Sequence, residues 1–255
     1  MMSEILLETR GLSKEFKGFT AVSAVDLQIH RGTIHALIGP NGAGKTTVFN
    51  LLTKFLLPSG GQILYKGRDI TAAKPADIAR QGIVRSFQIS AVFPHLTAHE
   101  NLLIALQRKE GLTFRFWRSR RSLDRFHDRA RELLASVGLE HQAETVAVEL
   151  PYGSKRSLEI VTTLALDPEL LLLDEPTQGM GREDVDRVVD LIRAVSANRT
   201  VLMVEHNLSV VSRLSDHITV LQRGSVVAEG NYETVSNNPE VRAAYIGGKH
   251  ESTKA

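Results

Sequence analysis

A glycine-rich segment near the start of the chain carries its clearest chemical signal. It fits the pattern G-x-x-x-x-G-K-[ST] and comprises Gly39, Pro40, Asn41, Gly42, Ala43, Gly44, Lys45, Thr46 and Thr47. The glycines allow the backbone to wrap a phosphate group with its N–H groups pointing inward. The segment therefore predicts a phosphate-binding loop. Lys45 would reach the β- and γ-phosphates of a nucleotide, and Thr46 would bind Mg²⁺.

The flanking sequence supplies the elements that such a loop requires. The apolar run at residues 34–38 predicts a buried strand, and apolar residues at helical spacing after Gly44 predict a helix through Leu52. The N-terminus of that helix would add a field that favours anions. A glycine-rich turn with a chance lysine is the alternative, and both flanking elements count against it.

A pair of acids at the end of another apolar run forms the second chemical signal. Residues 170–173 are four leucines, and Asp174 and Glu175 follow them directly. Buried parallel strands place ligands at their carboxyl ends. Asp174 could hold Mg²⁺ through its water shell, and Glu175 could polarise an attacking water. Alone, the acids could mark a strand-end turn, but together with the phosphate loop they predict phosphoryl transfer.

The composition allows one large domain, or a domain with a subdomain, in 255 residues. Hydrophobic residues make up 42% and charged residues 24%, which is typical of a globular protein with a sizeable core. The absence of cysteine excludes disulfides, thiolate metal sites and cysteine nucleophiles. A net charge of +2 argues against a dedicated nucleic-acid binder.

The distribution of apolar residues bears on location. No apolar run approaches the ~20 residues that span a bilayer. The N-terminus carries acids early and has no basic region before its apolar residues, unlike a signal peptide. We therefore expect a cytosolic chain whose membrane role, if any, is exerted through partner proteins.

Strand and helix signals alternate along most of the chain, which predicts an α/β fold with a mainly parallel sheet. Strands are expected near residues 5–7, 22–29, 34–38, 63–65, 170–173 and 200–204, followed by a hairpin of 218–221 and 226–229 around Arg223-Gly224. Helices are expected over 182–197 and 207–214, and residues 97–166 read as a mostly helical insert. The turn residues 58–61 are expected to end the helix that follows the phosphate loop.

With its motifs in this order, the sequence resembles the ATP-binding-cassette (ABC) family over roughly residues 5–247. The resemblance implies a single P-loop NTPase cassette. Such a cassette has a RecA-like core, an antiparallel β subdomain and a helical subdomain, here at about residues 90–166. Residues 248–255 are expected to form a flexible tail.

Three further positions match the family. Phe16 matches the aromatic that stacks on adenine, Gln88 the Q-loop glutamine, and His206 the switch histidine that contacts the γ-phosphate. The resemblance implies catalytic roles for Lys45, Glu175 and His206, and a Mg²⁺ site formed by Thr46, Gln88 and Asp174. The ATP site would comprise Phe16, Gln88 and the phosphate loop.

The family's signature segment, commonly Leu-Ser-Gly-Gly-Gln, is altered in this chain. The corresponding residues are Leu150, Pro151, Tyr152, Gly153 and Ser154. In the family this segment caps the ATP held by the opposite subunit, with a serine hydroxyl and backbone N–H groups on the γ-phosphate. Pro151 offers neither a hydroxyl nor an N–H group, so Gly153, Ser154 and a helix N-terminus remain for that contact.

Several segments resemble the importers of branched-chain amino acids, or of urea and amides. Tyr152 in the signature and the segment Thr-Gln-Gly-Met at 177–180 resemble that branch, as does the C-terminal run 238–247. The insert at 108–131 is longer than in compact cassettes and holds nine Lys or Arg and three acids. The lipopolysaccharide-export ATPase has a similar C-terminal end but lacks this insert.

The insert itself has three interpretations. A solvated charged face is the plainest, since charge runs usually have that role. Its basic residues could instead lie near anionic lipid headgroups. A nucleic-acid patch is the least favoured, because no recognised binding motif accompanies it.

The resemblance also implies cofactors and partners. ATP and Mg²⁺ would be bound between two cassettes arranged head to tail. The altered signature favours a heterodimer with a second ABC ATPase, and a homodimer is the alternative. Two membrane-spanning permease subunits would be direct partners, and a periplasmic or extracellular substrate-binding protein an indirect one, with no nucleic acid. The chain would then lie peripherally on the cytoplasmic face of the inner or plasma membrane.

Two function classes outside transport remain as alternatives. One is a soluble ABC protein of DNA repair or translation, but this chain has neither a second cassette nor long coiled-coil arms. The other is a non-hydrolysing regulatory subunit, against which Glu175 and His206 argue.

Overall fold

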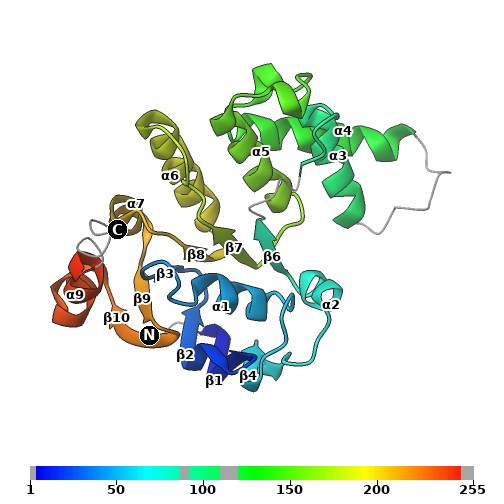
Figure 1. Ribbon diagram of the computed structural model, residues 1–255. Coiled ribbons are helices and arrows are strands. Elements are labelled where there is room, and N and C mark those ends of the chain that lie inside the picture. Colours follow the sequence, from blue (N-terminus) through cyan, green and yellow to red (C-terminus); the bar gives the residue numbers. More distant parts are fainter. Residues whose placement is uncertain (1–3, 87–91, 110–119, 248–255) are drawn as a thin grey trace.

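The computed structural model describes residues 4–86, 92–109 and 120–247 of the chain. Two sheets and a lobe of helices make up this part of the molecule (Figure 1). Gln88 and the predicted tail at 248–255 lie outside the described residues. Within the described ranges, no helix is both long and apolar enough to cross a membrane.

The larger sheet has the strand order β10-β9-β3-β8-β7-β6. Its strands are β3 (Ile34–Ile38), β6 (Ile83–Ser86), β7 (Leu170–Asp174), β8 (Thr200–Val204), β9 (His217–Gln222) and β10 (Ser225–Gly230). All neighbours are parallel except β10, which forms the antiparallel hairpin with β9. Every residue of β3, β7 and β8 is buried, as expected for parallel strands covered on both faces. The predicted mainly parallel sheet is confirmed.

The smaller sheet is antiparallel and has the order β2-β1-β4-β5. It consists of β1 (Ile5–Phe16), β2 (Phe19–His30), β4 (Gly60–Tyr65) and β5 (Arg68–Asp69). Helix α1 (Lys45–Leu52) lies between the two sheets, and its apolar side chains share one buried cluster with both (Figure 1). The helix that follows the phosphate loop therefore packs against a sheet on each of two sides.

Helices on the other face of the larger sheet bury a second apolar cluster against it. They are α6 (Arg182–Ser196), α7 (Leu208–Leu214), α8 (Tyr232–Asn237) and α9 (Pro239–Gly247). The predicted helices at 182–197 and 207–214 are confirmed, with Asn207 capping α7 by accepting from the Ser209 N–H at 3.1 Å. Helix α8 carries no strong periodic signal, and we did not predict it.

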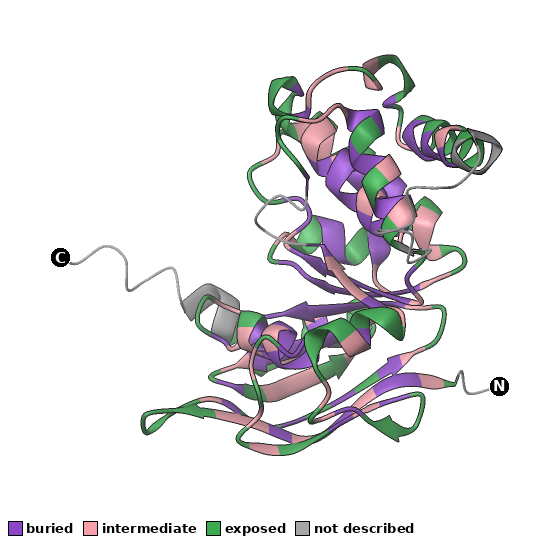
Figure 2. Cartoon of the chain, turned by 90° about the vertical axis from the view of Figure 1, so that its right-hand side faces the viewer, coloured by how far each residue is buried: buried purple, intermediate pink, exposed green. Residues whose placement is uncertain are grey.

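The helical lobe has a core of its own. It contains α3 (Ala98–Lys109), α4 (Arg120–Ala135) and α5 (Tyr152–Leu164), which surround a third buried cluster. Figure 2 shows the buried residues lining the facing sides of these helices and the strands of the larger sheet. The mostly helical character predicted for residues 97–166 is thereby confirmed for those that the structure describes.

The sequence interpretation was wrong about the end of α1. The helix ends at Leu52 and not at residues 58–61, where β4 already begins. Lys54 adopts a left-handed φ of 62°, which ends the helix, and the Thr53 hydroxyl donates to the Phe49 carbonyl at 2.7 Å in the last turn. Helix α2 (Pro75–Arg80) and strand β6 were also missed, since both are too short for a periodic signal.

His35 on β3 makes the stability of the fold depend on pH. Its side chain is buried, and burial, followed by the nearby His217 and His30, lowers its pKa to about 3. Below pH 6.5, His35 is therefore protonated in the unfolded chain but stays neutral in the folded chain until about pH 3. The free energy of unfolding consequently falls as the pH falls. Between neutral pH and pH 5 the loss from this residue is about 2 kcal/mol. Urea unfolding of the parent and of His35→Gln at both pH values measures it. An equal pH dependence in the two proteins would contradict the prediction.

Candidate nucleotide site

Three neighbouring parallel strands end at the same edge of the larger sheet. The phosphate loop follows β3, Asp174 ends β7 and is followed by Glu175, and His206 lies two residues after β8. The register pairs Leu37 with Val204 and Asp174 with Val204. The structure therefore brings together, at the carboxyl ends of adjacent strands, residues that lie far apart in the sequence.

Glycine is required at two positions of the phosphate loop. Gly39 and Gly44 have φ values of 151° and 103°. A Cβ atom on Gly44 would lie 2.7 Å from the carbonyl oxygen of Ala21, and one on Gly39 would collide with that of Leu221. The loop thus fits tightly between β2 and the end of β9. Only a chain without side chains at these points can follow that path.

Lys45 lies inside the loop that precedes it. Its Nζ donates to the carbonyls of Gly39 at 2.7 Å and Pro40 at 3.0 Å. Burial lowers the pKa of Lys45, and the negative charges of Glu175 and Asp174 oppose that shift. The lysine and both acids therefore share one electrostatic environment, as expected of a cation and two carboxylates around a bound phosphate.

Asp174 is almost completely buried, with 1% of its surface exposed. Its Oδ2 forms an ion pair with Arg85 of β6, whereas its Oδ1 has no hydrogen-bond partner among the residues that the structure describes. A buried carboxylate oxygen without a partner is costly, and oxygen is the ligand that Mg²⁺ prefers. Asp174 therefore fits a hydrated cation held next to the phosphate loop. Thr46, exposed at the start of α1, adds a hydroxyl group to the possible ligand set.

Glu175 adopts a backbone conformation that is rare for a residue with a side chain. Its φ is 45°, while its N–H donates to the Val204 carbonyl at 2.9 Å. Residues held in this left-handed region are strained and cluster at functional sites. The side chain is only partly buried. It is thus the carboxylate of the pair that remains available to a water molecule.

Glu205, which sequence reasoning passed over, organises the segment around His206. Its carboxylate is fully buried and accepts hydrogen bonds on both oxygens. Oε1 accepts from the N–H and hydroxyl of Thr177 at 3.1 and 2.6 Å. Oε2 accepts from the N–H groups of His206 and Asn207 at 3.0 and 3.2 Å. Glu205 therefore joins the loop after β8 to the segment after β7 and leaves the His206 side chain exposed.

Glu205→Gln is expected to loosen this junction. A glutamine amide has only one accepting oxygen. Its NH₂ group, itself a donor, would face backbone N–H groups that donate to the carboxylate in the parent protein. We expect a loss of about 1–3 kcal/mol in the free energy of unfolding. Urea unfolding measures it, with Glu233→Gln on exposed α8 as the matched control. Equal stability of the two variants would show that Glu205 does not hold the junction.

The aromatic residue predicted to stack on adenine lies at the tip of the β1–β2 hairpin. The ring of Phe16 is 40% exposed, and the ammonium of Lys14 lies 5.2 Å from its centre. The hairpin also reaches the sheet edge, because the Ser23 N–H donates to the Gly224 carbonyl at 2.8 Å. Phe16 therefore belongs to a hairpin that contacts this edge of the sheet, and its stacking on adenine stays a prediction.

The signature segment contacts the region after Glu175 in the same chain. Pro151 caps α5, and the Tyr152 hydroxyl donates to the Gln178 carbonyl at 3.0 Å. Gly153 lies against the Asp184 side chain of α6, because a Cβ added to it would be 2.7 Å from Cγ of Asp184. Leu150 is buried in the helical lobe, and Ser154 lines a cleft of about 610 Å³ between α5 and α6.

Arg156 ties this segment to the acid strand. Its guanidinium donates to the carbonyls of Asp174 at 2.9 Å and Pro176 at 3.2 Å, and to Glu159 at 2.7 Å. The arginine is buried, like its acidic partner. Sequence reasoning missed both Arg85 and Arg156. In the sequence, each arginine is visible only as a charged residue within an apolar pattern, and that pattern does not indicate which residue the arginine pairs with.

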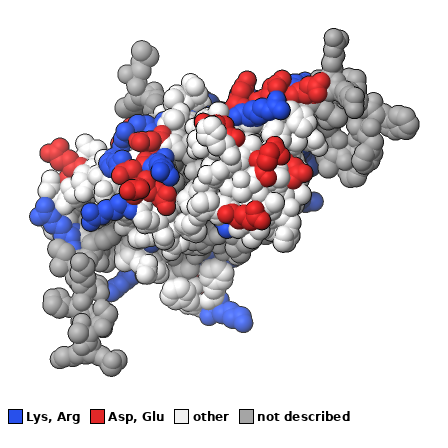
Figure 3. Space-filling view, turned by 90° about the horizontal axis from the view of Figure 1, so that it is seen from above, with Lys and Arg blue, Asp and Glu red and all other residues white. Residues whose placement is uncertain are grey.

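Residues 110–119 of the basic insert lie outside the described ranges. In α4, Arg129 pairs with Glu132 at 2.7 Å and Arg131 with Asp128 at 3.4 Å. Viewed from the side of the helical lobe, the visible charges of both signs are interspersed (Figure 3). The described part of the insert thus matches the interpretation as a solvated charged face.

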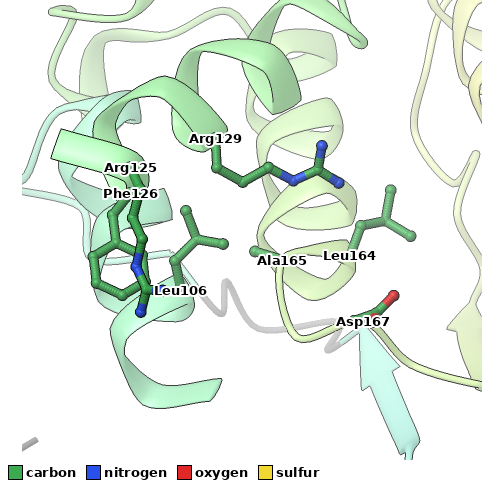
Figure 4. Close-up of a pocket in the computed structure, with 7 residues that line it drawn as sticks. All are labelled: Leu106, Arg125, Phe126, Arg129, Leu164, Ala165 and Asp167. Carbon is green, nitrogen blue, oxygen red and sulfur yellow. The ribbon is translucent and has the colours of Figure 1, made fainter. Parts of the chain in front are cut away.

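A separate hollow of about 290 Å³ lies in the lobe between α3, α4 and the end of α5 (Figure 4). Arg129 and Asp167 point toward it, but Arg129 pairs with Glu132 and Asp167 with Arg199. The residues lining it include no predicted site residue. We assign it no role.

A family comparison decides the identity of the chain. The sequence model described as ABC transporter matches residues 22–178, which include the phosphate loop, the acid strand and the signature. The chain belongs to the ABC transporter family. A second family model, described as branched-chain amino acid ATP-binding cassette transporter, matches residues 225–251 of this ABC cassette.

Individual relatives support the same assignment. The high-affinity branched-chain amino acid transport ATP-binding protein LivG of Escherichia coli K12 is 40% identical over 96% of this ABC chain and 99% of its own length. BraF of Pseudomonas aeruginosa, which carries the same description, matches equally, at 40% over the same shares. A cassette of an ABC transporter solved in its ADP conformation has a TM-score of 0.84 at 29% identity, covering 96% and 100% of the chains.

These findings confirm the predicted family and fold class. The chain is an ABC ATPase that binds nucleotide, as its family and its full-length relatives require.

Proposed function

We propose that this chain is the ATP-hydrolysing subunit of an importer for branched-chain amino acids. The observation that carries the proposal is the match to the branched-chain cassette model at residues 225–251, next to 40% identity with LivG over nearly the whole chain. The C-terminal match covers β10, α8 and α9, none of which carries a residue predicted to bind the nucleotide. It therefore reflects more than the motifs that all ABC ATPases share.

The site geometry supports specific roles for the acids and the histidine. Glu175 polarises the attacking water and accepts its proton, because its carboxylate is accessible while that of Asp174 is tied to Arg85. His206 contacts the γ-phosphate, in the position that Glu205 sets. Lys45 neutralises phosphate charge, so catalysis consists mainly of positioning and charge stabilisation.

The remaining residues of the site bind and orient the nucleotide. The amides of the phosphate loop and the start of α1 hold the phosphates, and Phe16 stacks on the base. Asp174, Thr46 and Gln88 would hold Mg²⁺, and the bound ion would supply charge neutralisation for the phosphoryl group. Oδ1 of Asp174, to which no described residue donates a hydrogen bond, supports this metal assignment.

The signature supports a second subunit. Its residues contact Gln178 and Asp184 of their own chain, beside the acids and not over the phosphate loop. The segment would therefore act on the nucleotide of an opposing cassette. Because Pro151 offers no hydrogen bond there, we propose a heterodimer with a related ATPase. Efficient ATP-driven homodimerisation of the purified Glu175→Gln protein would count against it.

A groove between the sheet and the helical lobe supports a membrane-spanning partner. It has a volume of about 590 Å³ and is lined by α2, β6, α3, α5 and the segment that follows α1. Its rim exposes three large apolar side chains, Phe55, Phe93 and Ile104, at 56%, 51% and 38%. We propose that a helix of a permease subunit docks there, on the cytoplasmic face of the membrane.

Uptake of radiolabelled solutes in the source organism tests the proposed substrate. Cells in which the chain carries Glu175→Gln are expected to lose high-affinity leucine uptake and to keep uptake of urea and acetamide. Loss of urea or acetamide uptake with leucine uptake intact would replace this proposal by the urea or amide importer. No change in any of the three would overturn the importer assignment.

The docking groove is tested in the same cells. Ile104→Asp on the rim is expected to release the chain from the membrane fraction, while the purified variant keeps its nucleotide affinity. Tyr232→Asp on α8, where the side chain is also 38% exposed, is the control and should stay membrane-bound. Membrane retention of Ile104→Asp would refute the groove as the docking surface.

A further inference from the structure

Arg85 of β6 is a buried arginine that no motif of the family explains. Its side chain is 9% exposed, and its partner Asp174 is 1% exposed. Burying two charges costs several kcal/mol per ion unless each is paired and hydrogen-bonded. The pair also occupies one oxygen of the carboxylate that is proposed to hold the metal. A contribution to stability alone therefore does not explain why the arginine lies at this carboxylate.

Three contacts fix the arginine on elements that build the site. Nη2 meets Oδ2 of Asp174 on β7, and Nη1 donates to Oδ1 of Asn50 on α1 at 2.7 Å. The guanidinium also lies over the ring of Phe49, 5.6 Å from its centre. Both α1 residues belong to the helix that begins at the phosphate loop. One planar cation thus connects the acid strand to the phosphate-loop helix.

This geometry determines which carboxylate oxygen remains available. Since Arg85 engages Oδ2, Oδ1 of Asp174 is left without a partner within the described part of the chain. Through Asn50 and Phe49, the same guanidinium sets that oxygen relative to α1, where Thr46 lies. A lysine at position 85 would supply the positive charge, but it could not donate to Asp174 and Asn50 from one planar group.

Resting on the proposed Mg²⁺–nucleotide site, we propose that Arg85 is a positioning residue for the metal. It engages Oδ2 of Asp174 and so leaves Oδ1 as the oxygen that would face a hydrated Mg²⁺. Replacing a residue that holds a metal-ligating carboxylate typically changes the metal affinity by about 10- to 100-fold. A purely structural salt bridge would change stability but not the response to the metal.

Binding of a non-hydrolysable fluorescent ATP analogue, measured in EDTA and against rising Mg²⁺, tests this proposal. Arg85→Gln is expected to raise the Mg²⁺ concentration at half-effect by about tenfold. The affinity of Arg85→Gln for the analogue in EDTA should stay within about twofold of the parent's, because the phosphate loop is unchanged. Arg85→Lys should fall between Arg85→Gln and the parent. The surface variant Arg80→Gln is the matched control, since its partner Asp77 is also exposed.

Two further variants keep the test decisive. In an Asp174→Asn background, Arg85→Gln should cause no additional shift, because it acts through that carboxylate. Asn50→Ala keeps the ion pair but removes one anchor, and should shift the Mg²⁺ midpoint by about threefold, below the range for losing a whole outer partner. It serves in place of Arg85→Gln if that variant does not fold.

The outcomes separate the two proposals. An unchanged Mg²⁺ midpoint in the folded Arg85 variants, and likewise in Asn50→Ala, overturns the positioning role. So does a full additional shift in the Asp174→Asn background. If the parent protein itself shows no Mg²⁺ dependence, the proposed metal site fails and the inference fails with it. A Mg²⁺-dependent parent with unaffected variants refutes only the role of Arg85.

Discussion

Glu175→Gln is expected to lower the rate of ATP hydrolysis by about 10²- to 10⁴-fold while nucleotide binding is kept. Glutamine has nearly the same shape and can still orient a water molecule, but it cannot accept a proton. The backbone N–H that bonds to Val204 is untouched by the change, so the strained turn after β7 should persist. Steady-state phosphate release and equilibrium nucleotide binding, measured side by side, check both halves of the prediction.

A neighbouring acid provides the control for this experiment. Glu183→Gln in the first turn of α6 removes an equal charge from an exposed position and should leave hydrolysis unchanged. Parent-like hydrolysis by Glu175→Gln would refute its assignment as the catalytic base. Loss of binding together with turnover would instead indicate that Glu175 shapes the site.

Arg156→Met is expected to lower the free energy of unfolding by about 3–5 kcal/mol. The arginine and Glu159 are about nine-tenths buried, so removing one leaves an unpaired charge in the interior. The carbonyls of Asp174 and Pro176 would lose their donors as well. Because both belong to the acid strand and the turn after it, we expect turnover to fall too. Urea unfolding and steady-state hydrolysis measure the two effects.

Two comparisons isolate the buried pair. The double variant Arg156→Met/Glu159→Met should recover part of the lost stability, because no isolated charge remains. Arg129→Met breaks a surface pair with the same i,i+3 spacing, in which the side chains are 55% and 65% exposed, and should cost less than about 1 kcal/mol. If Arg156→Met cost no more than this surface change, the buried contacts would carry no special weight.

Local patterns in the sequence were enough to predict the framework of the site. The strands β3, β7 and β8 are short apolar runs, and the phosphate loop and the two acids follow such runs directly. Their placement at one edge follows from the rule that adjacent parallel strands end together. These features need only residues within one element, so the sequence shows them.

The contacts that hold the site depend on chain folding instead. Arg85 meets Asp174 across 89 positions of sequence, and Thr177 meets Glu205 across 28. Lys54 ends α1 through a backbone angle that residue type alone does not indicate. A buried charge must find a partner wherever the packed elements bring one near, and no local period encodes that choice. The chemistry at the strand ends is thus local, whereas its positioning arises only when distant segments share one low-dielectric interior.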